Sequence, residues 1–488
     1  MSESVQPAVD RLTASPVRFW RKSVWLTVLL SSTTLIVVEV LYWALGSHRL
    51  FDGLYFESAS SEEMMQTIEL RRLAESPIET LWYLHFQPPG FDFLRLFLAI
   101  PEWVSTGTPS VTAVDVRLYV LYAVLFGCLN GIIFYWAHVI SGSVVVSAIT
   151  VVFWSMYPGN LFIATYLDSM YVSAFLLVLA VHFWFLSIRN LKSRWLLGAA
   201  TCVLVLALTR TSLQPILIPG LVLIAVVVVT RIFPVKDRRV LGCVASAICL
   251  LALALPMKQL FLFSTPASST TSGHHLLGMI QYVPSDQEME EILVPERVLK
   301  NGSVVQNKFN NAQELTTNYK YSRIFFKRLI HHPADSFRGA LISAKRSIIK
   351  GAGATHRYQR NVLTDDLPWS VGAATLFSGT SYVIFVCAGI AVLAIAQRRI
   401  RYLTWRTTML RSLVPVALLI LVLMTLLFGS MRFTDNPATG EAFGWTDGFS
   451  WTETDRLKFL LEPFVLPPAI LGLVMAARIS VNALLKFF

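Results

Sequence analysis

Apolar runs of about 20 residues recur along this 488-residue chain and constrain its fold more than any other feature. A helix of about 20 residues, rising 1.5 Å per residue, crosses the ~30 Å hydrocarbon core of a bilayer. We predict ten crossings, near 23–45, 117–140, 143–157, 167–187, 195–209, 214–230, 240–263, 371–396, 412–430 and 457–477. The predicted fold class is therefore an all-α polytopic membrane protein whose large extracytoplasmic loops carry amphipathic helices.

Composition supports this fold class. Only 15% of the residues are charged and 55% are hydrophobic, whereas an average soluble domain is about one quarter charged. A soluble enzyme, a disordered chain and a disulfide-rich secreted module are excluded. All five cysteines fall inside apolar runs, without the spacing of a disulfide framework or a metal site.

The distribution of Lys and Arg predicts the orientation. The N-terminus and alternate short loops are rich in basic residues, and their only acidic residues are Glu3, Asp10 and Asp237. Since cytoplasmic loops carry the excess of Lys and Arg, we expect both termini in the cytoplasm. The net charge of +11 then reflects topology, and no nucleic-acid partner is expected. A plasma membrane of the bacterial type is favoured over the endoplasmic reticulum.

This topology divides the chain into four parts. They are a cytoplasmic N-terminus (1–22), an N-terminal transmembrane module (23–263, with outer loop 46–116), an extracytoplasmic loop region (264–370), and a C-terminal transmembrane module (371–488, with outer loop 431–456). Within the loop region, 333–350 has the pattern of an amphipathic helix lying on the outer leaflet. Any chemistry is expected on the outer face.

The first outer loop carries an acidic pair, Glu62 and Glu63. Ser60 and Glu63 fit a capping box, and a short helix is expected to hold Glu62, Gln66 and Glu69 on one side. A solvated charged face is the simpler interpretation of that side. Further on, the sequence His85-Phe-Gln-Pro-Pro-Gly predicts a rigid turn with His85, Gln87 and Asp92 around it, because two prolines forbid helix there.

An acidic pair after the first span, followed by His-x-x-Pro-Pro before the second, resembles the GT-C superfamily of membrane glycosyltransferases, which includes protein O-mannosyltransferases and aminoarabinose transferases. Three later segments are also similar to that superfamily: Tyr157-Pro-Gly-Asn to Asp168, Leu208-Thr-Arg210-Thr, and Glu453-Thr-Asp-Arg456 with Glu462-Pro463 beyond it. In the superfamily the pair is usually Asp-Glu, so Asp52 and Glu57 remain alternative carboxylates.

The resemblance implies transfer of a sugar from a polyprenyl-phosphate donor in the bilayer to a glycan, lipid or protein acceptor, with inversion. A carboxylate would accept the acceptor's proton, and we assign this role to Glu62, with Glu63 or Asp168 as the second carboxylate. Guanidinium groups would meet the charge of the leaving phosphate. The candidates are Arg210, Arg432 and Arg456, with His356 and Arg357 as further options, while His85, Gln87 and Asp52 would position the acceptor or the loop. No cofactor is required, and a divalent cation remains an option.

Other interpretations stay open. Arg210 could be a snorkelling residue at the interface, Arg456 could pair with Glu453, and Glu39 could pair within the bundle. The adjacent pairs His274-His275 and His331-His332 lack the pattern of a zinc site. As a whole, the chain could instead be a transporter or flippase of lipid-linked glycans, a polymerase or ligase of cell-envelope glycans, or a non-catalytic assembly partner.

Overall fold

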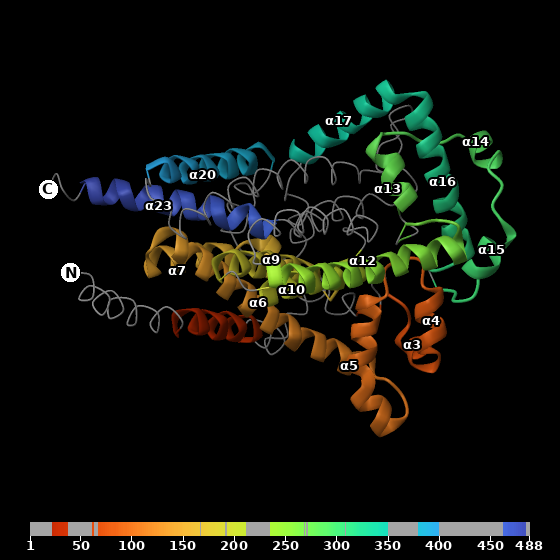
Figure 1. Ribbon diagram of the computed structural model, residues 1–488, viewed down its shortest axis with the longest axis horizontal. Helices are drawn as coiled ribbons and strands as arrows, with labels where there is room; N and C mark the ends of the chain where they lie inside the picture. Colours follow the sequence, from red (N-terminus) through yellow and green to blue (C-terminus); the bar gives the residue numbers. More distant parts are fainter. Residues whose placement is uncertain are drawn as a thin grey trace, which may run out of the picture.

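The computed structural model describes residues 22–37, 61–62, 67–165, 167–190, 193–210, 235–267, 269, 272–307, 309–349, 379–399 and 462–484. All regular elements in these ranges are helices (Figure 1). The predominantly apolar ones are α6 (Val111–Ser141), α7 (Val144–Ser155), α9 (Ser169–Asn190), α10 (Ser193–Thr209), α12 (Val235–Phe263), α20 (Gly379–Arg399) and α23 (Leu466–Leu484). A helix also covers 22–37, the short α8 spans Pro158–Thr165, and a single 3-10 turn, η3 (Glu462–Phe464), precedes α23.

Four of these helices, α6, α9, α12 and the η3–α23 unit, are long and apolar enough to cross a membrane. Residues 22–37, α7, α10 and the middle of α20 are shorter apolar helices. The protein is therefore a helical membrane protein, as predicted. The predicted runs at 214–230 and 412–430 lie outside the described residues, and ten crossings stay a prediction.

Small residues let the apolar helices approach closely. A Cβ atom on Gly472 of α23 would lie 2.1 Å from the carbonyl oxygen of Gly389 in α20. On α6, a Cβ atom on Gly127 would lie 2.0 Å from Ser32 Oγ, and one on Gly131 would lie 2.6 Å from Val28. Because lipid tails are as apolar as the helices, close packing of this kind drives helix association in membranes.

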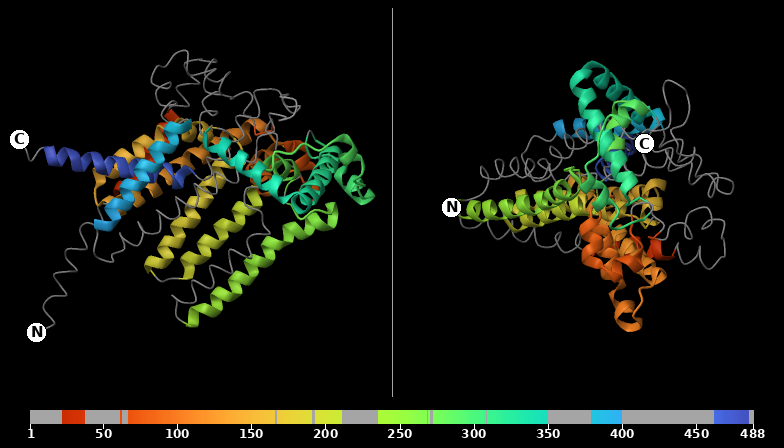
Figure 2. Two further views of the ribbon diagram at one scale, coloured as in Figure 1. Left: turned by 90° about the horizontal axis from the view of Figure 1, so that it is seen from above. Right: turned by 90° about the vertical axis from the view of Figure 1, so that its right-hand side faces the viewer.

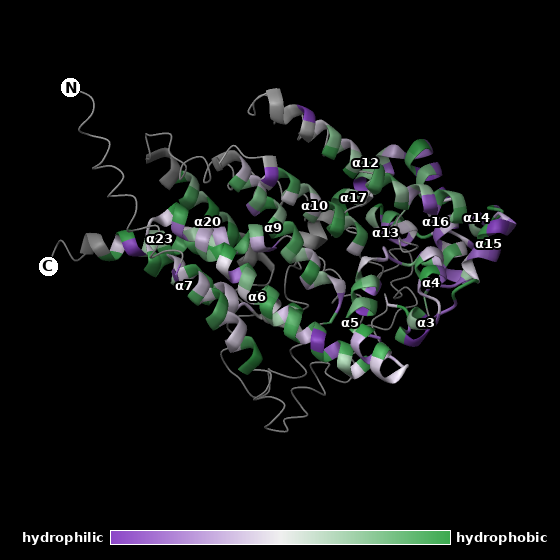
Figure 3. Ribbon diagram, turned by 60° about the horizontal axis from the view of Figure 1, so that its bottom comes forward, coloured by the Kyte–Doolittle hydropathy of each residue, from purple (hydrophilic) through white to green (hydrophobic). Residues whose placement is uncertain are grey.

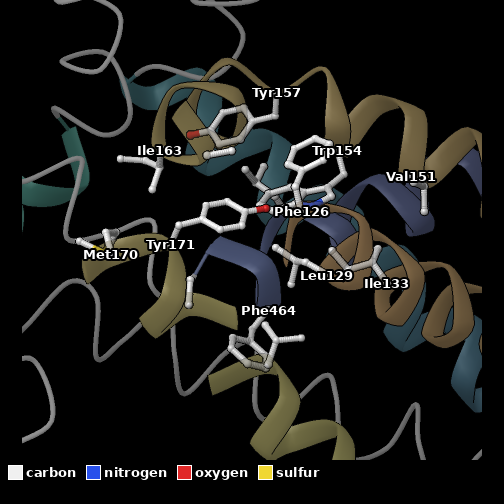
Figure 4. Close-up of a cluster of buried hydrophobic side chains, with 14 of the residues drawn as sticks. Phe126, Leu129, Ile133, Val151, Trp154, Tyr157, Ile163, Met170, Tyr171 and Phe464 are labelled. Atoms are coloured by element: carbon white, nitrogen blue, oxygen red, sulfur yellow. The ribbon is translucent and has the colours of Figure 1, made fainter. Parts of the chain in front are cut away.

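The main core lies where α6, α7, α9 and the start of α23 meet (Figure 4). Trp154 and Tyr171 are completely buried there and lie near Phe126 of α6 and Phe464 of η3. Ser110 begins α6 by accepting a hydrogen bond from the Ala113 amide, as an N-cap residue does. This core holds α6, α7, α9 and α23 together, and the first outer loop leads directly into α6.

The two segments that the sequence predicts to lie outside the membrane, 46–116 and 264–370, are called here the first and second outer segments. Their described parts fold into helices at one end of the bundle, which we call the loop end. The first outer segment forms α3 (Leu70–Glu75), α4 (Pro77–Tyr83) and α5 (Gly90–Thr106). The second forms α13 (Ser272–Met279), α14 (Asp286–Glu290), α15 (Glu296–Gly302), α16 (Ala312–His331) and α17 (Pro333–Ile349). Figure 1 shows both sets at the end opposite the C-terminal end of α23, and hydrophilic residues gather there (Figure 3).

Two sequence expectations can be compared directly with these helices. The predicted amphipathic helix at 333–350 is present as α17. The predicted short helix carrying Glu62 is wrong in its start: the helix begins at Leu70, and Glu62 belongs to a turn. The proposed capping residues Ser60 and Glu63 lie outside the described residues.

Candidate functional site

Asp168 and Arg210 meet at the loop end of the antiparallel α9–α10 pair. Arg210 Nη1 lies 3.6 Å from Asp168 Oδ2, and the two side chains are 2% and 4% exposed. The same nitrogen donates a hydrogen bond to Ser169 Oγ at 2.8 Å. The Tyr122 hydroxyl of α6 donates to the Asp168 carbonyl oxygen. Arg210 is therefore a buried partner of Asp168, and its interpretation as a residue that snorkels to the interface is wrong.

Helices from both outer segments lie beside this pair. A Cβ atom on Gly90, the first residue of α5, would lie only 2.6 Å from the Leu208 carbonyl oxygen at the end of α10. From the second outer segment, His275 of α13 lies near enough to Arg210 for their charges to interact. Burial lowers the pKa of His275 to about 4, assisted by His274 and Arg210. His275 is therefore neutral at neutral pH.

Glu62 lies in a turn that is held from three sides. The Ser61 amide donates to Asp115 Oδ1 of α6 at 3.1 Å, and Ser61 Oγ accepts from Arg95 Nε at 3.1 Å. The Ser61 carbonyl accepts from Thr67 Oγ1 at 2.5 Å. Glu62 Oε1 itself accepts from the Leu70 amide at 2.9 Å, which satisfies a donor at the start of α3. The carboxylate is half-buried and its position is fixed by these contacts.

A buried ion pair on α5 supports that turn. Arg95 Nη1 lies 2.9 Å from Asp92 Oδ1, and both side chains are fully buried. Arg95 Nη1 also donates to the Ile68 carbonyl at 2.7 Å, and Asp92 Oδ1 accepts from the Ile68 amide at 3.2 Å. Gln87 Nε2 donates to Asp92 Oδ2 at 3.1 Å. Burial raises the pKa of Asp92, while Arg95 and these donors act in the opposite direction.

The predicted Pro-Pro turn joins the two outer segments. Asn310 Oδ1, from the second segment, accepts from the amides of His85 and Phe86 at 2.8 and 3.1 Å. Ser269 Oγ donates to the Phe86 carbonyl at 2.6 Å, and Lys258 Nζ of α12 donates to the Leu84 carbonyl at 3.0 Å. The backbone of this turn is therefore bound by the second outer segment and by α12.

The His85 side chain is enclosed within this junction. It is 1% exposed, and its ring packs edge-on against Phe263 of α12, with centroids 5.0 Å apart. Burial lowers the pKa of His85 to about 3, and nearby Lys258 acts in the same direction. A neutral, enclosed imidazole can position the turn but is poorly placed to exchange a proton with a substrate.

Other predicted site residues are not part of the described structure. Glu63, Asp52, Arg432 and Arg456 lie outside the described residues, as do Glu39, Glu57, His356 and Arg357. In the ranges that are described, no three His, Cys, Asp or Glu side chains are grouped so that they could hold a metal ion. The predicted site residues within the described structure are therefore the Asp168–Arg210 pair, Glu62 in its turn before α3, and His85 and Gln87 around the Pro-Pro turn.

Sequence reasoning missed several residues that build this region. Arg95 had a usable signal, since it lies three residues after Asp92 in an otherwise apolar helical stretch. Asn310 had none, because its partners His85 and Phe86 are more than 220 residues away. Glu462 was noted only as part of a motif. It is 2% exposed, and its Oε1 accepts from the Tyr157 hydroxyl at 2.7 Å.

Comparisons of the chain with protein-family models, with curated proteins and with solved structures find no match.

Proposed function

We propose that this protein is a membrane glycosyltransferase that moves a sugar from a polyprenyl-phosphate donor to a glycan, lipid or protein acceptor on the extracytoplasmic face. The observation that carries the proposal is the buried Asp168–Arg210 pair at the loop end, with α5 and α13 packed beside it. Buried charges at membrane depth are expensive, and an ionisable residue there is by default a hypothesis for a functional site.

Arg210 is the proposed ligand of the donor phosphate. A guanidinium group stays charged at every accessible pH and can give a phosphate two parallel hydrogen bonds. The 3.6 Å separation from Asp168 Oδ2 exceeds a good hydrogen bond, whereas the bond to Ser169 Oγ is a normal 2.8 Å. We assign Asp168 and Ser169 the role of holding the guanidinium in place before the donor arrives.

Glu62 is the proposed general base. The acceptor oxygen forms a bond to the anomeric carbon of the sugar while its proton passes to the Glu62 carboxylate. The bond between the anomeric carbon and the phosphate oxygen breaks, and the phosphate leaves with its lipid and its charge, next to Arg210. Attack from the side opposite the leaving group inverts the anomeric centre. The fixed turn around Ser61 supports this role, because a base must be held in position to be effective.

The proposal includes a topology. The loop end faces the extracytoplasmic side of a plasma membrane, the chain crosses ten times, and both termini lie in the cytoplasm. The gathering of both described outer segments at one end of the bundle supports this arrangement (Figure 1).

The test is a donor panel. Purified full-length protein in proteoliposomes is incubated with radiolabelled polyprenyl-phosphate sugars and a mixed acceptor extract, and release of the free lipid phosphate is measured. We expect release from at least one donor, and Arg210→Lys should raise the KM for that donor because Lys loses the bidentate contact. Movement of a donor across the bilayer with its sugar still attached would contradict transfer and favour a flippase.

A further inference from the structure

α5 exposes an unusual face. Phe93, Phe97, Ile100 and Val104 are 59%, 61%, 41% and 80% exposed. Their spacing of four, three and four residues places them in one stripe along the helix. Phe91, Asp92, Arg95 and Ala99 are the buried residues of α5 and occupy the opposite side.

All charged residues of α5 turn away from this stripe. Asp92 and Arg95 form the buried pair described above, and Glu102 pairs with Arg117 of α6. Arg117 Nη1 also donates to the Leu98 carbonyl at 2.6 Å. A continuous surface of large apolar side chains without a charge is unfavourable in water and marks a contact with lipid or protein.

The helix also runs in an unusual direction. The apolar helices α6, α9, α12 and α23 run along the bundle, and α5 crosses that direction at the loop end (Figure 1). In the right-hand view of Figure 2, the helices of the first outer segment (orange) extend below the other helices. A helix across the bundle axis lies parallel to the plane of a membrane that the bundle spans.

We propose that α5 lies flat in the lipid leaflet at the loop end, with the Phe93–Phe97–Ile100–Val104 stripe against the acyl chains. The exposed apolar side chains of the stripe therefore contact lipid rather than another protein. Two observations favour lipid over a second copy of the chain: the stripe offers no charge or hydrogen-bonding group for a protein partner, and the helix direction matches the membrane plane. Trp82 and Ile78 of neighbouring α4, 50% and 85% exposed, add side chains suited to the interface.

This placement fixes the depth of the Glu62 turn. Arg95, on the inner side of α5, donates to both Ser61 Oγ and the Ile68 carbonyl. A helix anchored by lipid on one side and by these contacts on the other holds the turn at headgroup level. The inference rests on exposure and direction alone and is independent of sugar transfer.

Spin-label accessibility tests the proposal. The five native cysteines are replaced by alanine, one cysteine is introduced at Phe97 or at Val104, and the full-length protein is reconstituted in vesicles of phosphatidylcholine and phosphatidylglycerol. Val104 is 80% exposed near the end of α5, so its replacement removes little packing. The control is a label at Arg71 of α3, whose side chain is 84% exposed and paired with Glu75 on the helix surface.

Collision of each label with oxygen, which concentrates in lipid, is compared with collision with a water-soluble nickel chelate. We expect oxygen to dominate at positions 97 and 104 and nickel to dominate at position 71. Dominant nickel collision at 97 and 104 would place the stripe in water and overturn the proposal. Weak collision with both probes would place it against protein and overturn it equally.

Discussion

Replacing Arg95 by Met should destabilise the protein more than any surface substitution, because it leaves a carboxylate buried without its cation. Asp92 and Arg95 are both fully buried, and Arg95 makes three contacts, with Asp92, Ile68 and Ser61. After the substitution, Asp92 keeps only the donors from Gln87 and the Ile68 amide. Removing one partner of a buried pair costs about 3–5 kcal/mol. We expect a loss of this size in the free energy of unfolding at neutral pH.

The loss should depend on pH in a defined direction. Burial raises the pKa of Asp92 and Arg95 lowers it, so the pKa rises further in Arg95→Met. A carboxyl whose pKa is raised by folding favours the folded state at low pH, and this contribution disappears as pH rises through the folded-state pKa. The destabilisation should therefore be largest at high pH and shrink as the solution is acidified.

The measurement is reversible unfolding of the full chain in mixed micelles, followed by circular dichroism. In the Arg95→Met background, Asp92→Asn should recover part of the loss, because a neutral amide replaces the stranded carboxylate. Arg71→Met, which breaks an exposed ion pair with Glu75, is the matched control and should not change stability measurably. A loss below about 1 kcal/mol for Arg95→Met, or one that is independent of pH, would refute the reasoning.

Three further predictions use the same assay. As the pH is lowered from 6.5 to about 3, His85 becomes protonated in the unfolded chain but stays neutral in the folded one. The free energy of unfolding should therefore decrease as the pH falls through this window, and His85→Phe should make the decrease smaller. Asn310→Ala leaves the buried amides of His85 and Phe86 without their acceptor and should lower the free energy of unfolding by at least about 2 kcal/mol. An unchanged free energy of unfolding would contradict the role of Asn310 in joining the two outer segments. Gly472→Leu should cost about 1–3 kcal/mol or more, because the new side chain would push α23 away from Gly389 in α20. Gly242→Leu should be tolerated, because in the described structure no atom outside its own helix turn lies within 4 Å of the Cβ position.

The sequence predicts the apolar helices well because each span is continuous along the chain. The runs at 117–140, 167–187 and 240–263 fall within or largely overlap α6, α9 and α12. α17 was also predictable, since its apolar positions repeat at helical spacing. Local patterns of this kind require no knowledge of what packs against them.

The candidate site was only partly predictable. Asp168 and Arg210 were each identified, but they were assigned separate roles, because nothing in a sequence shows that residues at the ends of two different helices will meet. Glu62 was placed on a helix by its spacing from Gln66 and Glu69. In the structure, its carboxylate instead accepts a hydrogen bond from the amide of Leu70, the first residue of α3. The outward apolar stripe of α5 was not predictable, because apolar residues at helical spacing do not show whether they pack inside the bundle or remain exposed.

The most direct test of the proposed transfer is the rate of lipid-phosphate release by Glu62→Gln, measured beside Glu75→Gln with the donor that wild-type protein consumes. A Gln side chain keeps an oxygen that can accept from the Leu70 amide, so the turn should persist while the proton acceptor is lost. Glu75 is 58% exposed on α3 and pairs with Arg71 on the helix surface. We predict that release is abolished in Glu62→Gln and retained in Glu75→Gln. Wild-type release by a folded Glu62→Gln protein would contradict the role of Glu62 as the base.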